Sequence, residues 1–225
     1  MIKRSKLFSI VIALAAALLV ISGSIALPIL FRGFYYLHID ALELEATSGF
    51  DETAIREAYD EMLDFCVLKT PFGTGDLRWS ESGRSHFEDV AKLFRLDFAV
   101  AAAATAALLI CLFFARRTGL RPHRLLGRAP QFWAGAVTAA AFVVVGLLVS
   151  RDFNAAFRLF HALFFPGKDN WVFDYRADEI ILILPQAFFR NCAILIVAAL
   201  LTCCVVMVLS DLLPRRGRRR RNKRY

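Results

Sequence analysis

The sequence predicts an all-α integral membrane protein with four transmembrane helices, and three observations support this prediction. Of its 225 residues, 58% are apolar, and the mean hydropathy is +0.52. A soluble domain averages about 45–50% apolar residues, so the chain exceeds what one core of its size needs. The apolar residues gather in four runs without a charged side chain, and most Lys and Arg residues lie in short segments beside those runs.

The four charge-free runs are long enough to span a bilayer. They cover residues 7–31, 98–115, 129–150 and 191–210, and a helix needs roughly 17–25 such residues to cross the hydrocarbon core. Lys3, Arg4 and Lys6 precede the first run as they would in a signal peptide. That run exceeds the roughly 7–15 apolar residues of a usual signal peptide, so we expect an uncleaved anchor.

The charges predict the orientation of the spans. Residues 1–6, 116–128 and 214–225 contain three, five and eight basic residues and no acidic ones. Residues 33–97 contain 14 acidic and six basic residues, and residues 151–190 contain five of each. Because short cytoplasmic loops are enriched in Lys and Arg, we expect both termini to be cytoplasmic. The basic tail is expected to rest on the phospholipid bilayer rather than on nucleic acid, since no aromatic residues interrupt its arginines.

The chain reads as one membrane domain over 1–225, with a small extracytoplasmic helical cap at 33–97 between the first two spans. Asp51 is placed to cap a first helix, whose apolar residues recur at three and four until residues 71–75 (PFGTG) break it. A second helix begins near residues 80–82 and leads into the second span.

The second cap helix contains His86, which lies 12 residues before Phe98. On a straight helix this separation is about 18 Å, which is far above the hydrocarbon. Two alternatives follow from this distance. Residues 82–95 could lie obliquely in the interface, or Asp97 could lie inside the bundle.

Residues 153–165 (FNAAFRLFHALFF) are too short to span and predict an interfacial or re-entrant helix between the third and fourth spans. Asn154, Arg158 and His161 fall at i, i+4 and i+7, so they form one polar stripe among phenylalanines. Trp171 and its neighbours Phe173 and Tyr175 are typical of an aromatic interface belt.

Arg190 follows Pro185 and precedes the last charge-free run. If the last helix begins at Ile180, Arg190 lies about 15 Å along it and should face a partner or a water-filled site. If the span begins at Asn191, Arg190 is interfacial. The sequence leaves both alternatives open.

His86 and His161 are the candidate catalytic residues, because an imidazole can take and return a proton near neutral pH. The sequence has no serine-hydrolase elbow, no zinc-protease histidine pair and no P-loop, and its Cys and His spacing predicts no metal site. We therefore expect neither a metal nor a cofactor. Two other functions remain open, a non-catalytic membrane interaction protein and a small transporter subunit.

The segments around both histidines resemble the lipoprotein intramolecular transacylase (Lit) family. Residues 79–90 (WSESGRSHFEDV) resemble one signature of the family. A second signature of the family is similar to three segments of this sequence, residues 160–165 (FHALFF), 170–173 (NWVF) and 184–189 (LPQAFF). The resemblance implies a bacterial membrane lipoprotein substrate whose N-terminal Cys carries a thioether-linked diacylglyceryl group. The sn-2 acyl chain moves to the α-amino group of that Cys and leaves the lyso form.

The resemblance also implies roles for particular residues at the extracytoplasmic leaflet. His161 is expected to be the general base and His86 the proton donor or oxyanion partner, or the reverse, without a covalent acyl-enzyme. Ester-to-amide transfer is downhill, so it needs no ATP. The expected substrate-binding residues are Arg158, Asn154, Arg190, Asp89 and Trp171, with Asp89 placed to hold an imidazole tautomer. The oligomeric state is not predicted.

Overall fold

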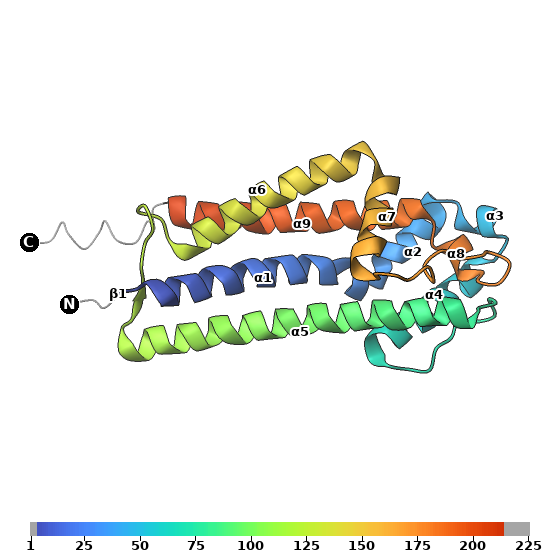
Figure 1. Ribbon diagram of the computed structural model, residues 1–225, viewed down its shortest axis with the longest axis horizontal. Helices are drawn as coiled ribbons and strands as arrows, with labels where there is room; N and C mark the ends of the chain where they lie inside the picture. The colour runs from blue at the N-terminus through green and yellow to red at the C-terminus, as the bar shows by residue number, and fades with distance from the viewer. Residues whose placement is uncertain (1–3, 214–225) are drawn as a thin grey trace, which may run out of the picture.

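The computed structural model describes residues 4–213, and nearly all of its regular structure is helical. Four helices are long and apolar enough to cross a membrane, as the charge-free runs predict. They are α1 (Lys6–Leu30), α5 (Glu81–Thr118), α6 (Pro130–Arg151) and α9 (Gln186–Leu212). Helix α1 packs most extensively on α5, and helix α6 packs most extensively on α9. Helix α1 also contacts α6 and α9. The four helices run side by side along the long axis of the molecule (Figure 1).

The four spanning helices bury few side chains against one another. In the most apolar 18-residue stretch of each helix, at most 17% is buried inside the molecule. The large apolar side chains that these helices expose are mostly Leu, Val, Ile and Phe. Where α6 meets α9 the contact is close, because a Cβ at Gly135 would lie 2.8 Å from the carbonyl oxygen of Cys204. Small residues at such contacts allow helix backbones to approach closely in lipid. The exposed apolar faces are those of a bundle surrounded by acyl chains.

The cap at one end of the bundle has its own core. It is built by α2 (Arg32–Ala41), α3 (Leu44–Ser48), α4 (Glu52–Leu68) and the single turn α8 (Ile180–Ile183), which gather beside the start of α5 (Figure 1). Tyr35 stacks on Tyr59 with ring centroids 3.6 Å apart, and its hydroxyl donates to the carbonyl of Ile183 at 2.9 Å. Residues distant in the sequence thus close one core, which fixes the outer ends of α5 and α9.

Both cap helices expected from the sequence are present. Asp51 accepts a hydrogen bond from the amide of Ala54 at the start of α4, and Ser80 accepts one from Gly83 at the start of α5. Helix α4 ends at Leu68, where Lys69 adopts a left-handed conformation. The helix therefore stops before the break expected at residues 71–75.

The structure agrees with the second alternative for residues 82–97 and differs from both alternatives for the start of the last helix. Helix α5 continues unbroken from Glu81 through the second charge-free run, so residues 82–95 do not bend away from the span. Asp97 instead has a buried carboxylate oxygen within the bundle. In the last apolar segment, Pro185 separates α8 from α9, so Arg190 is the fifth residue of α9 and neither considered helix start is correct.

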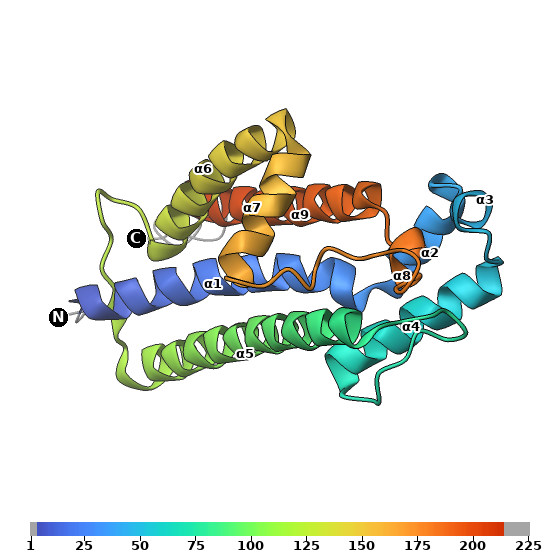
Figure 2. The ribbon, with the colours of Figure 1, turned by 45° about the vertical axis from the view of Figure 1, so that its right-hand side comes forward.

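Helix α7 (Phe153–Phe164) is the predicted short helix between the third and fourth spans. It leaves the end of α6 and crosses the bundle towards α5, as both ribbon views show (Figures 1 and 2). The chain then runs without regular helix or strand through residues 166–179 to α8.

The opposite end of the bundle joins the loop after α5 to both ends of the described chain. The two-residue strands β1 (Arg4–Ser5) and β2 (Arg121–Pro122) pair in parallel, and Arg124 donates to Asp211 at 2.6 Å. The described chain thus begins and ends on the side away from the cap (Figure 1). The predicted basic tail at 214–225 lies outside the described residues.

Candidate active site

Two histidines from different outer elements meet above the bundle. Helix α5 contributes His86 from its second turn, and α7, capped by Asp152, contributes His161 from its last turn. Their ring centroids are 5.8 Å apart with an interplanar angle of 30°, and each residue is only 6% exposed. Residues 75 positions apart in the sequence therefore form one buried pair of proton-transfer groups.

Aromatic side chains surround the pair on several sides. Trp171 stacks on His161 at 4.5 Å, and Phe165 and Phe173 meet the ring of His86 edge-on at 5.1 and 5.5 Å. The ring of Phe157 lies 4.3 Å from that of His161. Such an apolar enclosure limits water around the imidazoles and strengthens electrostatic interactions within it.

The two imidazoles differ in their hydrogen bonds. His161 Nδ1 lies 2.7 Å from the carbonyl oxygen of Phe157 one turn earlier. Because a carbonyl only accepts, Nδ1 must carry the proton, and in the neutral ring Nε2 is then the acceptor. His86 Nδ1 is buried and has no hydrogen-bond partner among residues 4–213.

Burial favours the neutral form of both rings. His86 and His161 both lie outside the charge-free runs that span the membrane. Desolvation and the neighbouring His161 lower the pKa of His86 to about 4, although Asp89 acts in the opposite direction. Desolvation also lowers the pKa of His161, against the effect of its bond to Phe157. Both imidazoles are therefore neutral at pH 7, which is the form that accepts a proton.

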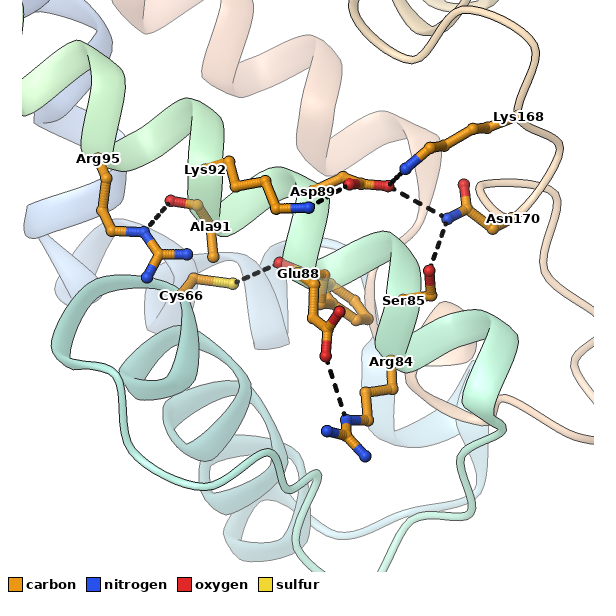
Figure 3. Close-up of polar contacts among 11 residues, drawn as sticks. Cys66, Arg84, Ser85, Glu88, Asp89, Ala91, Lys92, Arg95, Lys168 and Asn170 are labelled. Atoms are coloured by element: carbon orange, nitrogen blue, oxygen red, sulfur yellow. Dashed lines mark hydrogen bonds and ion pairs between the residues drawn. The ribbon is translucent and has the colours of Figure 1, made fainter.

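Asp89 lies one turn after His86 but does not contact its imidazole through a hydrogen bond. Its carboxylate binds Lys168 at 2.5 Å and Lys92 at 3.0 Å, and Asn170 lies 3.4 Å from it (Figure 3). The expectation that Asp89 holds an imidazole tautomer is therefore not met in this structure, because one of its oxygens is engaged by Lys92 of α5 and the other by the segment after α7.

Asn154 and Arg190 lie on a cleft beside the histidine pair rather than on the pair itself. Together with Phe153, Gln186 and Ala187, they line an open cleft of about 360 Å³ between α7 and α9. A second cleft of about 370 Å³ shares Gln186 and is otherwise apolar, lined by Phe157, Phe189 and their neighbours. Arg158 is exposed, so the predicted polar stripe of α7 is divided between the pair, the cleft and the surface.

Several residues at the site carry no local signal in the sequence. Lys168 reaches Asp89 across 79 residues, and a charged residue in a loop predicts no such partner. Phe165 and Phe173 were expected to be part of an apolar helix or an interface belt, whereas they cover His86. Only Trp171, among the expected substrate-binding residues, stacks directly on an imidazole.

No cluster of three or more potential metal ligands occurs within the part of the chain that the structure describes. The candidate site consists of two neutral imidazoles, an aromatic enclosure and an adjoining cleft with amide and guanidinium groups. Together with the four spanning helices, these features define a membrane-integral helical protein with a candidate acid–base site outside the bundle.

The family model of the lipoprotein intramolecular transacylase Lit matches residues 10–189, and the chain belongs to this family. Both histidines lie within the matched residues. No curated protein matches the sequence. Family membership gives the activity class, an intramolecular transacylase in a membrane.

Solved structures of a similar fold agree with this assignment. The chain is similar to the membrane-integral lipoprotein intramolecular transacylase Lit from Bacillus cereus, with 24% identity and a TM-score of 0.78 over 89% of this chain and 91% of that one. A variant of that protein with one histidine replaced by arginine has 23% identity and a TM-score of 0.74 over 89% of this chain and 87% of that one. At these identities the likeness shows the fold alone.

Proposed function

We propose that the protein moves the sn-2 acyl chain of a diacylglyceryl-modified cysteine to the α-amino group of the same cysteine in a bacterial membrane lipoprotein. The observation that supports this reaction best is the close approach of His86 and His161 within an aromatic enclosure. Ester and amine belong to one molecule, so holding them together supplies a high effective molarity. The site then has to provide proton transfer rather than an activated acyl donor.

His161 is the proposed general base. Its Nδ1 is engaged by the carbonyl of Phe157, which leaves Nε2 to accept a proton from the amine. The neutral amine attacks the ester carbonyl, and its nitrogen gives up one proton to the imidazole as the C–N bond and the tetrahedral intermediate form. The intermediate then collapses to the amide as the ester C–O bond breaks, and the imidazolium returns that proton to the glyceryl oxygen. No acyl group is attached to the protein in this sequence.

His86 is the proposed partner of the intermediate. Its buried Nδ1 has no partner among residues 4–213, so it can bind a substrate atom without breaking an existing contact. In the tautomer that carries the proton on Nδ1, it donates to the developing oxyanion, which is the charge that this reaction must stabilise. The roles of the two rings can also be exchanged, with His86 as the base.

The adjoining clefts are the proposed binding site for the rest of the substrate. The apolar cleft at Phe157 and Phe189 adjoins His161 and suits an acyl chain, while Asn154 and Arg190 suit the carbonyl groups of the lipid or the peptide. Trp171 covers the reacting groups. Arg158, exposed on α7, binds headgroup phosphates or the substrate as it enters.

The reaction is proposed to occur at the extracytoplasmic leaflet of the cell membrane. The acidic cap lies at one end of the bundle, and the basic loop after α5 lies at the other (Figure 1). His86 is in the second turn of α5, at the end of that helix beside the cap. The excess of positive charge supports a cytoplasmic location of the loop and both termini. Mature lipoproteins have their modified cysteine on the opposite side, where the site would meet it.

The proposal is tested by expressing the protein in a bacterial host that lacks apolipoprotein N-acyltransferase. Mass spectra of lipoprotein N-terminal peptides should show the N-acylated lyso form. Diacylglyceryl peptides that keep a free amine in the presence of the protein would contradict the proposed reaction.

Histidine variants test the mechanism in the same assay. His86→Ala and His161→Ala should each reduce conversion by about 10²–10⁴-fold, the usual contribution of general acid–base catalysis. His123→Ala is the matched control, because His123 lies in the loop at the opposite end of the bundle. A fully active double variant of His86 and His161 would contradict the mechanism but not the family assignment.

A further inference from the structure

Residues 166–179 form an irregular segment that crosses the outer part of α5 and covers the histidine pair. Trp171 of this segment stacks on His161, and Phe173 lies against both His86 and Phe87. The segment has no helix or strand to hold it in place. The positions of the two rings therefore depend on the side chains that bind the segment to α5.

Asp89 provides one of these attachments. The ammonium of Lys168 lies 2.5 Å from Asp89 Oδ2, and the amide of Asn170 lies 3.4 Å from the same oxygen and from Ser85 Oγ. Figure 3 shows these four side chains converging from α5 and the irregular segment. Lys92, on α5 itself, binds the other carboxylate oxygen at 3.0 Å.

The attachment is strong because its acceptor is buried and remains charged. Asp89 is 7% exposed. Burial opposes its ionisation, but the hydrogen bonds from Lys168, Lys92 and Asn170 outweigh that cost and lower the pKa of the carboxyl to about 2. A charge-assisted pair with a buried acceptor stabilises more than a fully exposed pair does.

The attachment continues directly to the imidazole. Lys168 accepts a hydrogen bond at its carbonyl oxygen from the indole Nε1 of Trp171, at 3.2 Å. Trp171 in turn stacks on His161. A series of contacts therefore leads from Asp89 through Lys168 and Trp171 to the proposed base, although Asp89 itself touches no reacting group.

We propose that Asp89 and Lys168 form a clasp that positions Trp171 and Phe173 on the histidine pair, and that the transfer reaction depends on this clasp. The inference rests on the proposed function. Asp89 acts as a positioning residue: it fixes the aromatic wall that orients His161 and keeps water from the amine and the ester.

Asp89→Asn tests the clasp, with Glu88→Gln as the matched control. Glu88 is the adjacent residue on α5, and its carboxylate pairs only with Arg84 of the same helix, at 3.5 Å, within the described chain. Asp89→Asn should lower kcat by up to about 10²-fold, the cost of a misplacement of about 1 Å, while Glu88→Gln should leave it unchanged.

Lys168 variants separate the clasp from a general loss of folding. The side chain of Lys168 is 45% exposed, so Lys168→Met should fold and should reproduce the Asp89→Asn defect. Lys168→Arg keeps the charge and should retain activity. In the double variant Asp89→Asn/Lys168→Met, the defect should not exceed that of either single variant, because one interaction is lost in all three. Defects that add independently would overturn the proposal.

Trp171 fluorescence provides a measurement that does not require turnover. In a background with Trp79 and Trp133 replaced by Phe, acrylamide should quench Trp171 more strongly after Asp89→Asn than after Glu88→Gln. Equal quenching together with wild-type conversion by Asp89→Asn would overturn the clasp. If the wild type produces no lyso-lipoprotein, the proposed function fails, and quenching still decides whether the clasp holds the segment.

Discussion

At the level of single residues, His161 is oriented by its own helix. Its Nδ1 donates to the carbonyl of Phe157 at 2.7 Å, which lies four residues earlier in the same helix. The last turn of α7 thus selects the tautomer of the proposed base without a carboxylate. This explains why Asp89 is available for a different task.

The neutral state of the pair predicts that acid destabilises the folded protein. Burial lowers the pKa of both histidines below the ordinary value of 6.5, to about 4 for His86. As pH falls, the unfolded chain binds protons first. The stabilisation is complete above pH 6.5 and is lost as pH falls through 6.5 towards 4, by on the order of 3 kcal/mol for His86.

Thermal unfolding in detergent between neutral pH and about pH 4.5 measures this loss. The unfolding midpoint should fall over that interval in the wild type and fall less in His86→Gln. Asp89, whose pKa is about 2, stays charged throughout, so the clasp is intact. If the unfolding midpoint of His86→Gln falls with pH as steeply as that of the wild type, protonation of His86 is not the cause of the loss of stability.

The sequence identifies both histidines and Trp171 but not the contacts among them. The polar stripe of α7 and the flanking motifs single out His161, and the family resemblance singles out His86. The pairing of Asp89 with Lys168 spans 79 residues and depends on the path of an irregular segment. Such a path follows from tertiary packing, which periodicity and spacing do not encode.

At the level of elements, the irregular segment is attached to α5 at a second point, near the start of that helix. Asp178 accepts hydrogen bonds from the backbone amide and hydroxyl of Ser80, both at 2.8 Å, and Arg78 pairs with Glu179. The segment is therefore fixed at both ends of its path over His86.

Gly83 lies under this second attachment. Its surroundings predict that a methyl group added at this position would lower both stability and activity. A Cβ at this position would overlap Asp178 Oδ1 and lie 3.1 Å from Phe173. Since Asp178 is held by Ser80, Gly83→Ala should destabilise the protein by about 1–3 kcal/mol and should reduce conversion by displacing Phe173 from His86.

The unfolding midpoint and lipoprotein conversion measure the two effects of Gly83→Ala. Gly23→Ala is the matched control, because Gly23 also lies within a helix and a Cβ there meets no atom within 4 Å. It should be neutral or stabilising by about 0.5–1 kcal/mol. Equal midpoints for the two variants would show that the segment yields to the added methyl group.

The sequence predicts the helices better than their ends. Apolar periodicity and the caps at Asp51 and Ser80 locate α4 and the start of α5, because these signals are local. The sequence does not predict where α8 ends and α9 begins, since Pro185 is compatible with the first turn of a helix as well as with a break. Here the cap core holds α8 apart, through Ile183 and Tyr35.

At the level of the whole molecule, acidic and basic residues are concentrated at opposite ends of the helix bundle. The net charge of +8 combines strongly basic segments with an acidic cap, and the loop between α5 and α6 is at the end opposite the cap. This arrangement predicts which side of the membrane each end occupies.

Cysteine labelling in intact cells tests the orientation. In a background without the five native cysteines, Thr53→Cys in the cap should react with a membrane-impermeant maleimide. Arg117→Cys, at the far end of α5, should react only after the cells are permeabilised. Both positions are exposed, so the difference reports the side of the membrane, and the reverse pattern would contradict the proposed leaflet.

The unbroken helix α5 has a mechanical consequence. One rigid rod of 38 residues carries both the span and His86, so the imidazole stands at a fixed height, about 18 Å from Phe98 along the helix axis. A thicker or thinner bilayer moves the membrane surface relative to that rod. The distance that a lipid ester must rise to reach the histidines is therefore set jointly by the protein and by the lipids around it.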